Sequence, residues 1–282
     1  MIIARYDHSM QPKNYIRILS IAGSDSGGGA GIQADLKTIS ALGCYGMTAI
    51  TAITAQNTVG VTGIQAITPD MLAAQIKAVV TDIGVDAVKI GMLHDPEVVH
   101  VVAAAIRDYK LTNVVLDPVM VATSGDALIA PPTIAVLVKE LFPLVTVITP
   151  NLDEAALLLN RPIKSRAELD AAAQDLVLMG AKAALVKGGH LAGDEVTDVL
   201  LTDNGFQNYS SPRIASQNTH GTGCTLSSAI ACYLGMGYPL AKAVASARSY
   251  ILQAIAAGAD VKIGAGHGPL NHGFAPIKMQ LV

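Results

Sequence analysis

Short, almost wholly apolar runs rich in β-branched residues alternate along this chain with longer segments of helical periodicity. The expected strands are 16–22, 47–55, 86–90, 113–117, 145–149 and 183–187. Strands that are apolar on successive residues are typical of a parallel sheet buried on both faces. The expected helices between them are 31–42, 69–82, 95–109, 132–141, 153–159 and 166–179. The alternation predicts an α/β fold in which helices cover both faces of a mostly parallel sheet.

The pattern changes after residue 187. A hairpin is expected from 196–202 and 206–209 around the turn Asp203-Asn204-Gly205, and two helices follow over 223–234 and 240–257. No linker, repeat or low-complexity segment interrupts this order. We therefore expect a single domain over residues 16–282, preceded by a short N-terminal extension over 1–15.

Charge is scarce: 15% of the residues are charged, 51% are hydrophobic, and the net charge is -3. These proportions exclude a disordered chain, and the lack of a basic run disfavours nucleic acid or anionic lipid as partners. We expect a small-molecule partner, no nucleic acid and no membrane. The three cysteines have no metal-binding spacing, and the N-terminal residues lack an apolar export segment, so a reducing cytoplasm is the expected location.

Glycine-rich and polar segments follow the expected strands. They are 23–31, 91–93, 117–120, 149–154, 187–190 and 219–224. In open α/β sheets, ligands bind at the carboxyl ends of the strands, where loops lead into helix N-termini. These segments are therefore the candidate binding site.

The first glycine loop, Gly29-Ala30-Gly31-Ile32-Gln33-Ala34, formally matches a dinucleotide-binding G-x-G-x-x-A. The acidic residue expected about 20 positions later is missing, because no Asp or Glu occurs between Asp35 and Asp70. A Gly-Lys-Ser/Thr of a Walker loop is also missing. Asp25 stands where a nucleophile elbow has Ser, which disfavours a serine hydrolase.

The segment Gly221-Thr222-Gly223 precedes an expected helix, where backbone N–H groups can converge on an anion. An ordinary glycine turn is the alternative. Cys224 falls in the first turn of that helix, where the N-terminal partial charge favours a thiolate. A base, a nucleophile and a small core residue are all possible roles for it.

Asn151 and Glu154 share the first turn of another expected helix, a placement suited to a hydrated Mg²⁺ or simply to helix capping. Lys187 ends an apolar strand before two glycines. Burial of its charge is costly unless it meets an anion, for which phosphate is the obvious candidate.

As a set and in this order, segments 22–25, 28–35, 55–58, 89–93, 117–120, 149–151, 187–190 and 218–224 resemble the motifs of hydroxymethylpyrimidine/phosphomethylpyrimidine kinases. The resemblance spans roughly residues 16–272 and implies the ribokinase-like fold of that superfamily, a three-layer αβα sandwich with a mostly parallel central sheet. It implies ATP-dependent phosphorylation of 4-amino-5-hydroxymethyl-2-methylpyrimidine and then of its monophosphate, giving the diphosphate used for thiamine phosphate. It also implies ATP and Mg²⁺ as cofactors and a homodimer.

Carried over by position, the resemblance implies the following site. Substrate would contact Gln56, Asp35, Gly23 and Met92; ATP would contact Lys187, Asn151 and Thr219; catalysis would involve Cys224, Lys187, Gly221, Thr222 and Gly223; Mg²⁺ would be held, partly through water, by Glu154, Asn151 and Asp117. The superfamily usually has Asp at the position of Cys224 as catalytic base, and this branch has Cys. A primary alcohol needs a base, whereas the phosphate of the second reaction is already largely dianionic near neutral pH.

The alternative within the same fold is a pyridoxal/pyridoxine kinase, as main or side activity. Relatives with strong pyridoxal activity carry a Cys after the segment at 117–121, where this chain has Ala122-Thr123-Ser124-Gly125, so the pyrimidine substrate is favoured. Residues 122–130 are expected to form a mobile lid. A catalytically silent sensor and a Rossmann dehydrogenase are alternatives from other classes.

Overall fold

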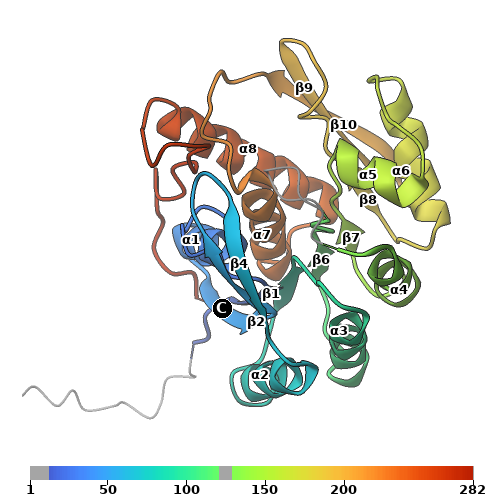
Figure 1. Ribbon diagram of the computed structural model, residues 1–282, viewed down its shortest axis with the longest axis vertical. Helices are drawn as coiled ribbons and strands as arrows, with labels where there is room; N and C mark the ends of the chain where they lie inside the picture. The colour runs from blue at the N-terminus through green and yellow to red at the C-terminus, as the bar shows by residue number, and fades with distance from the viewer. Residues whose placement is uncertain (1–12, 121–128, 282) are drawn as a thin grey trace, which may run out of the picture.

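The computed structural model describes residues 13–120 and 129–281 (Figure 1). Its strands are β1 (Arg17–Ala22), β2 (Tyr45–Ile50), β3 (Ala52–Gln56), β4 (Val61–Ala66), β5 (Ala87–Ile90), β6 (Val114–Leu116), β7 (Val147–Ile148), β8 (Ala184–Val186), β9 (Glu195–Thr202) and β10 (Gly205–Pro212). Its helices are α1 (Gly31–Ala41), α2 (Pro69–Asp82), α3 (Pro96–Asp108), α4 (Pro131–Leu141), α5 (Leu152–Leu159), α6 (Glu168–Leu178), α7 (Thr222–Gly235) and α8 (Leu240–Gly258). Nearly every helix lies within two residues of its predicted position.

The main sheet has the strand order β10-β9-β8-β7-β6-β5-β1-β2. Strands β2, β1, β5, β6, β7 and β8 are parallel, while β9 and β10 extend the sheet in antiparallel fashion. From β1 the chain runs first to β2 on one side and later to β5 on the other. Such a reversal of direction opens a crevice at the carboxyl ends of the strands.

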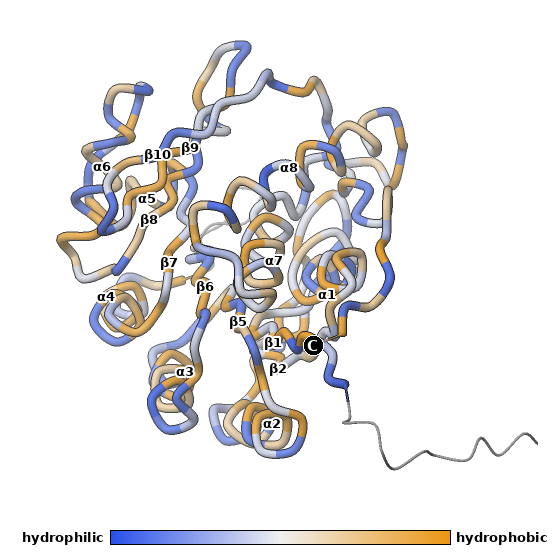
Figure 2. The backbone as a smooth tube through the Cα atoms, turned by 180° about the vertical axis from the view of Figure 1, so that it is seen from behind, coloured by the Kyte–Doolittle hydropathy of each residue, from blue (hydrophilic) through white to orange (hydrophobic). Residues whose placement is uncertain are grey.

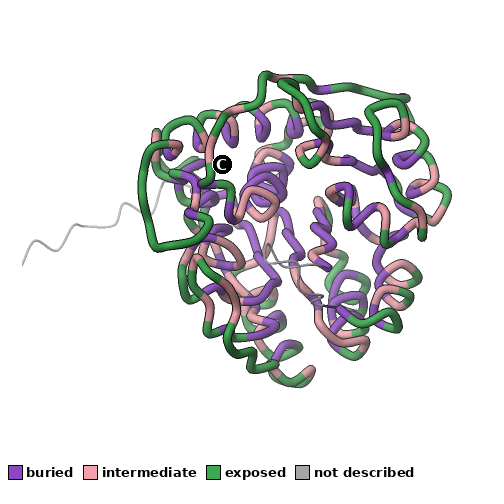
Figure 3. The backbone as a smooth tube through the Cα atoms, turned by 45° about the horizontal axis from the view of Figure 1, so that its top comes forward, coloured by how far each residue is buried: buried purple, intermediate pink, exposed green. Residues whose placement is uncertain are grey.

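Helices cover both faces of this sheet, which confirms the predicted three-layer fold. Successive strand residues belong to different apolar clusters: Ile18 belongs to the cluster that contains residues of α1, α7 and α8, whereas Leu19 belongs to the cluster that contains residues of α2 to α6. The hydrophobic residues gather on the central strands and α7 (Figure 2), and the same central part of the chain is buried (Figure 3). Burial on both faces explains why the strands read as continuous apolar runs.

The single strand predicted over 47–55 is wrong. The chain leaves the main sheet at Thr51, whose N–H donates to the carbonyl of Ala22, and β3 then pairs with β4 in a separate antiparallel hairpin. The turn between them is held by the Asn57 side chain, which accepts from the N–H groups of Val59 and Gly60. Residues 47–55 are an uninterrupted run of Thr, Ala and Ile after Met47, so the sequence pattern does not locate the point where the chain changes sheets.

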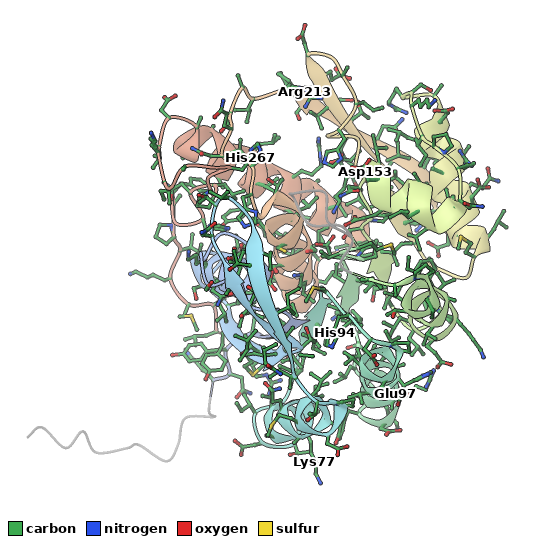
Figure 4. The ribbon with its side chains drawn as sticks, in the orientation of Figure 1. Lys77, His94, Glu97, Asp153, Arg213 and His267 are labelled. Carbon is green, nitrogen blue, oxygen red and sulfur yellow. The ribbon has the colours of Figure 1, made fainter. Side chains whose placement is uncertain are left out.

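Of the helices in residues 13–120 and 129–281, none combines the length and the hydropathy needed to cross a lipid bilayer. Residues 1–12 of the expected extension and residues 122–128 of the expected lid lie outside the described residues. Lys77 on α2 lies at the far end of the molecule from His267 (Figure 4).

Candidate active site

A pocket with a volume of about 180 Å³ lies at the carboxyl ends of the parallel strands. Ligand sites of α/β folds are found at this edge of the sheet. Its wall contains residues from five strand ends, from the β3–β4 hairpin and from the start of α7. The lining residues include Gly23, Asp25, Gln56, Val61, Ile64, Lys89, Met92, Asp117, Asn151, Glu154, Lys187, His220, Gly221, Gly223 and Cys224. Most residues predicted for the site therefore line one pocket.

Lys187 follows β8 and meets two carboxyl groups in the pocket. Its Nζ lies 3.0 Å from Oδ1 of Asp117 and 4.0 Å from Oε2 of Glu154. Burial alone lowers the pKa of the ammonium, but the charges of Asp117 and Glu154 outweigh burial and raise it. For Asp117, burial raises the carboxyl pKa, and the charges of Lys187 and then Lys89 bring it below its usual value. Lys187 is therefore a cation held at the pocket by anionic side chains.

The loop after Lys187 is anchored from outside the pocket. The N–H of Gly188 donates to Oδ1 of Asp198, and Nε of Arg248 on α8 donates to Oδ2 of the same carboxylate. Arg213 donates to three carbonyl groups of the loop, and Figure 4 shows this side chain near the base of the β9–β10 region. His190 lies 2.9 Å from Asp153, which Figure 4 labels at the start of α5. These contacts tie the loop to β9, to the start of α5 and to the residue that follows β10.

Asn151 and Glu154 form a capping box at the start of α5. The N–H of Glu154 donates to Oδ1 of Asn151, and the N–H of Asn151 donates to Oε2 of Glu154. The capping role considered from the sequence is thus present. Burial, only partly offset by Lys187, raises the pKa of Glu154 to about 7, so a further cation nearby would stabilise its ionised form.

Mg²⁺ is compatible with this corner of the pocket only as a hydrated ion. Within residues 13–120 and 129–281, no group of three or more His, Cys, Asp and Glu side chains could hold a metal ion. The carboxyl groups of Asp117 and Glu154 do flank Lys187 in the same wall. One or two carboxylates with retained waters and substrate phosphates are the usual Mg²⁺ environment, which these residues fit.

Gly221 makes the anion-binding turn possible. Its φ is +83°, a conformation that favours glycine, and its α-carbon lies against the carbonyl oxygen of Gly29. Among the described residues no side chain caps α7, so the first turn keeps N–H groups for an anion. Gly223 lines the pocket beside Lys187 and Asp117, whereas Thr219 and Thr222 do not line it. The Thr222 hydroxyl instead donates to the carbonyl of Thr219 within the turn.

Asp25 and His220 join the first glycine loop to the turn before α7. Asp25 is buried and accepts from the N–H groups of Gly27, Gly29 and Ala30. His220 Nε2 lies 2.9 Å from Asp25 Oδ2. Burial raises the pKa of Asp25, but the bonds from His220 and the backbone lower it further, so the carboxylate is ionised at neutral pH. Neither side chain was predicted to act in the site, although an Asp within a glycine-rich segment is a signal that could have found Asp25.

The β3–β4 hairpin supplies the opposite wall. Gln56 Nε2 lies 3.5 Å from His220 Nε2, and its Oε1 lies 3.2 Å from the hydroxyl of Thr54. Val61 and Ile64 add apolar surface from β4. Gly23 lies against Met92, whose terminal methyl would be 2.9 Å from a Cβ at that glycine. An amide with donor and acceptor groups thus faces a mainly apolar compartment.

The prediction that Asp35 contacts substrate is corrected by the structure. Asp35 is completely buried beneath the pocket, and its two oxygens accept from Lys89, Ser20 and Ser228. A carboxylate with all these donors has no free face for a ligand. Lys89, which the sequence analysis did not select, lines the pocket in its place.

The expectation of a thiolate at Cys224 also needs correction. Burial raises the pKa of the thiol to about 11, although the charge of Lys89 lowers it, so the protonated thiol dominates at neutral pH. The helix N-terminus is present as predicted, but removal of the sulfur from water has the larger effect.

Comparison with known proteins identifies a family for this arrangement. The family model described as phosphomethylpyrimidine kinase matches residues 25–271. The hydroxymethylpyrimidine/phosphomethylpyrimidine kinase of Rhizobium meliloti is 52% identical over 255 residues, which cover 90% of this chain and 96% of that protein. The crystal structure of phosphomethylpyrimidine kinase from Clostridium difficile is 43% identical with a TM-score of 0.75, covering 85% of this chain and 99% of that one. An ADP complex of Bacillus subtilis pyridoxal kinase is 36% identical with a TM-score of 0.85, covering 92% and 98%.

Proposed function

Because this chain belongs to the phosphomethylpyrimidine kinase family, we propose that it phosphorylates 4-amino-5-hydroxymethyl-2-methylpyrimidine and then its monophosphate for thiamine phosphate synthesis. ATP is the phosphoryl donor. One observation carries the proposal: a single pocket is lined both by Lys187 and the turn before α7, which suit phosphate, and by the Gln56 amide with apolar neighbours, which suit a pyrimidine ring. Donor and acceptor can therefore meet within a single pocket.

The donor side acts through charge and position. Lys187 exchanges its contact with Asp117 for one with the ATP phosphates, and the N–H groups of residues 221–223 hold the transferred phosphoryl group. Thr219 shapes this turn through its carbonyl. Asn151, Glu154 and Asp117 would hold Mg²⁺, partly through water, and the ion would neutralise phosphate charge.

The acceptor side recognises an aminopyrimidine. Gln56 can accept from the amino group and donate to the neighbouring ring nitrogen, because a primary amide offers both functions. Met92 and Gly23 leave a slot for the flat ring, and Val61 and Ile64 cover it from the hairpin. The pyrimidine ring is neutral, and the residues assigned to it are uncharged. The charged side chains of the pocket lie at the strand ends instead.

Cys224 is the base for the first phosphorylation. The hydroxyl proton passes to the Cys224 sulfur in its thiolate form, the alcohol oxygen bonds to the γ-phosphorus, and the bond from that phosphorus to the β–γ bridging oxygen breaks to release ADP. In the second reaction the attacking oxygen belongs to a phosphate that is already largely ionised. That step needs no base.

A direct test measures ADP formation with three acceptors in parallel: hydroxymethylpyrimidine, its monophosphate and pyridoxal. We expect turnover with both pyrimidines and a kcat/KM for pyridoxal at least tenfold lower. A higher kcat/KM for pyridoxal would establish the pyridoxal kinase alternative, which the likeness to the Bacillus subtilis enzyme supports. No turnover with any acceptor would leave a binding protein instead.

The requirement for Mg²⁺ is tested in the same assay by chelation with EDTA and restoration with MgCl₂. The homodimer implied by the family resemblance is a further part of this proposal. Sedimentation velocity at micromolar concentration tests it, with a species of twice the 29.1 kDa chain mass as the expected result.

A further inference from the structure

A completely buried ion pair lies under the acceptor end of the pocket. Nζ of Lys89, on β5, lies 2.9 Å from both carboxylate oxygens of Asp35, on α1, and both side chains are 0% exposed. Ser20 and Ser228 donate to the same carboxylate at 2.6 and 2.8 Å. Taking two charges out of water costs more than most ion pairs return, so stability alone is a weak reason to retain this pair.

The pair lies one helical turn below Cys224. Ser228, which donates to Asp35, is four residues after Cys224 on α7 and so lies on the same face of that helix. Asp35 is likewise four residues after Gly31 on α1, and the backbone N–H of Gly31 lies close enough to the Cys224 sulfur to lower the pKa of the thiol. The two helices therefore approach each other at two successive turns. The Cys224 sulfur lies between their first turns, and the Lys89–Asp35 pair lies one turn further along.

Room for the ammonium is made by a glycine. A Cβ at Gly91 would lie 3.0 Å from Lys89 Nζ and 2.9 Å from the methyl group of Ala22. Lys89 also lines the pocket together with Cys224. The ammonium is therefore held by Asp35 of α1, whose carboxylate Ser228 of α7 fixes in turn, and it has little freedom to move.

The charges that face Cys224 come from several elements. Lys89 on β5 favours the thiolate; Asp35 on α1 and Asp117 after β6 disfavour it. Lys187 after β8 also interacts with the sulfur, but it is committed to Asp117 and Glu154. Lys89 is thus the cation whose position does not depend on ATP.

We infer that Lys89 is a positioning residue for the first phosphorylation: its ammonium, locked by Asp35, stabilises the Cys224 sulfur in the anionic form that accepts the proton of the acceptor alcohol. The inference rests on the proposed function for the identity of the alcohol. The effect of Lys89 on the pKa of the Cys224 thiol does not depend on that identity, and it can be measured without a kinase assay.

The test compares neutral replacements of the whole pair, because removal of one charge would leave the other unpaired. The variants are Lys89→Met with Asp35→Asn, and Lys89→Gln with Asp35→Asn, which keeps more hydrogen bonds. Arg17→Met with Asp86→Asn is the matched control, since that ion pair lies at the opposite end of β1 and β5. The rate of Cys224 alkylation by iodoacetamide is followed by peptide mass spectrometry from pH 7 to 10.5. Cys44 and Cys232, at 1% and 0% exposure, serve as internal references.

We expect both neutral pairs to slow Cys224 alkylation about tenfold at each pH in this range, which corresponds to a thiol pKa about one unit higher, while the control pair leaves the rate unchanged. The kcat for the alcohol acceptor should fall by a similar factor and the kcat for the phosphate acceptor by less than threefold. An unchanged alkylation rate in either folded variant overturns the inference, whatever happens to the kinase rates. If the wild-type protein forms no ADP but alkylation slows in both variants, the proposed function fails and the role of Lys89 stands.

Discussion

Lys187 and Asp117 form a hydrogen-bonded ion pair, 3.0 Å between Nζ and Oδ1, although β7 separates the two strands that carry them. The contact is possible because both residues lie beyond the carboxyl ends of parallel strands, where neighbouring loops converge on one edge of the sheet. Asp117 also accepts from Thr149 and Ser227, so its carboxylate stays in place when the ammonium moves to a phosphate.

Lys187→Met should reduce kcat with ATP by about 10²- to 10³-fold, because it removes a cation aimed at developing phosphate charge. It should also lower the free energy of unfolding by roughly 3 kcal/mol, since Asp117 loses a buried partner. Lys182→Met, at the exposed opposite end of the same strand, is the control and should change stability by less than about 0.5 kcal/mol. Urea unfolding measures the stability of each variant, and ADP formation measures its kcat. Equal values for Lys187→Met and Lys182→Met would contradict the role of Lys187 in phosphate binding.

Gly221→Ala should lower both stability and ATP affinity. Its added Cβ would strain a residue at φ +83° and overlap the carbonyl of Gly29. Gly237→Ala is a matched control, because Gly237 also has φ +83° but open space around it, so strain alone should cost about 1 kcal/mol. We expect Gly221→Ala to cost at least twice as much in urea unfolding and to raise the KM for ATP. Similar costs would mean that the close approach to Gly29 is unimportant.

The two phosphorylations should differ in pH dependence. Because burial raises the pKa of Cys224 to about 11, the thiolate fraction rises about tenfold per pH unit through the neutral range, and kcat for the alcohol acceptor should rise with it. The phosphate acceptor should give a nearly flat profile above pH 7. Cys224→Ser should abolish the slope and weaken the first reaction much more than the second. Equal losses in both reactions would exclude Cys224 as base.

Glu154 should make the protein less stable as pH rises. Its carboxyl pKa is about 7 when folded and near 4.5 when unfolded, so the folded state retains a proton that the unfolded state loses. The corresponding stability is fully present below pH 4.5 and is lost as pH rises through 7. Between pH 5 and 8 the wild-type protein should lose on the order of 1–3 kcal/mol of unfolding free energy through Glu154. Glu154→Gln keeps an oxygen that can accept from the N–H of Asn151, and it should make this loss smaller. Urea unfolding at both pH values measures it, and parallel pH profiles for the two proteins would refute the shift.

Much of the fold was predictable because its elements are encoded locally. The apolar runs locate β1, β5, β6 and β8, and the proline or Asp at several helix starts locates α2 and α3. The break at Thr51 was not predictable, since the run of Thr, Ala and Ile residues over 48–55 suits a strand equally well whether β3 stays in the main sheet or leaves it.

The site follows the same division. The sequence by itself determined that its glycine, carboxylate and lysine motifs would gather at one edge of the sheet, because parallel strands bring their following loops together. Only the tertiary structure decided the contacts and protonation of these groups. Asp35 forms an ion pair with Lys89, 54 residues away along the chain, and burial raises the pKa of the Cys224 thiol. The spacing of motifs gives only their order along the chain. Which ion pair a side chain forms, and how far it is removed from water, depends on the distant side chains that pack against it.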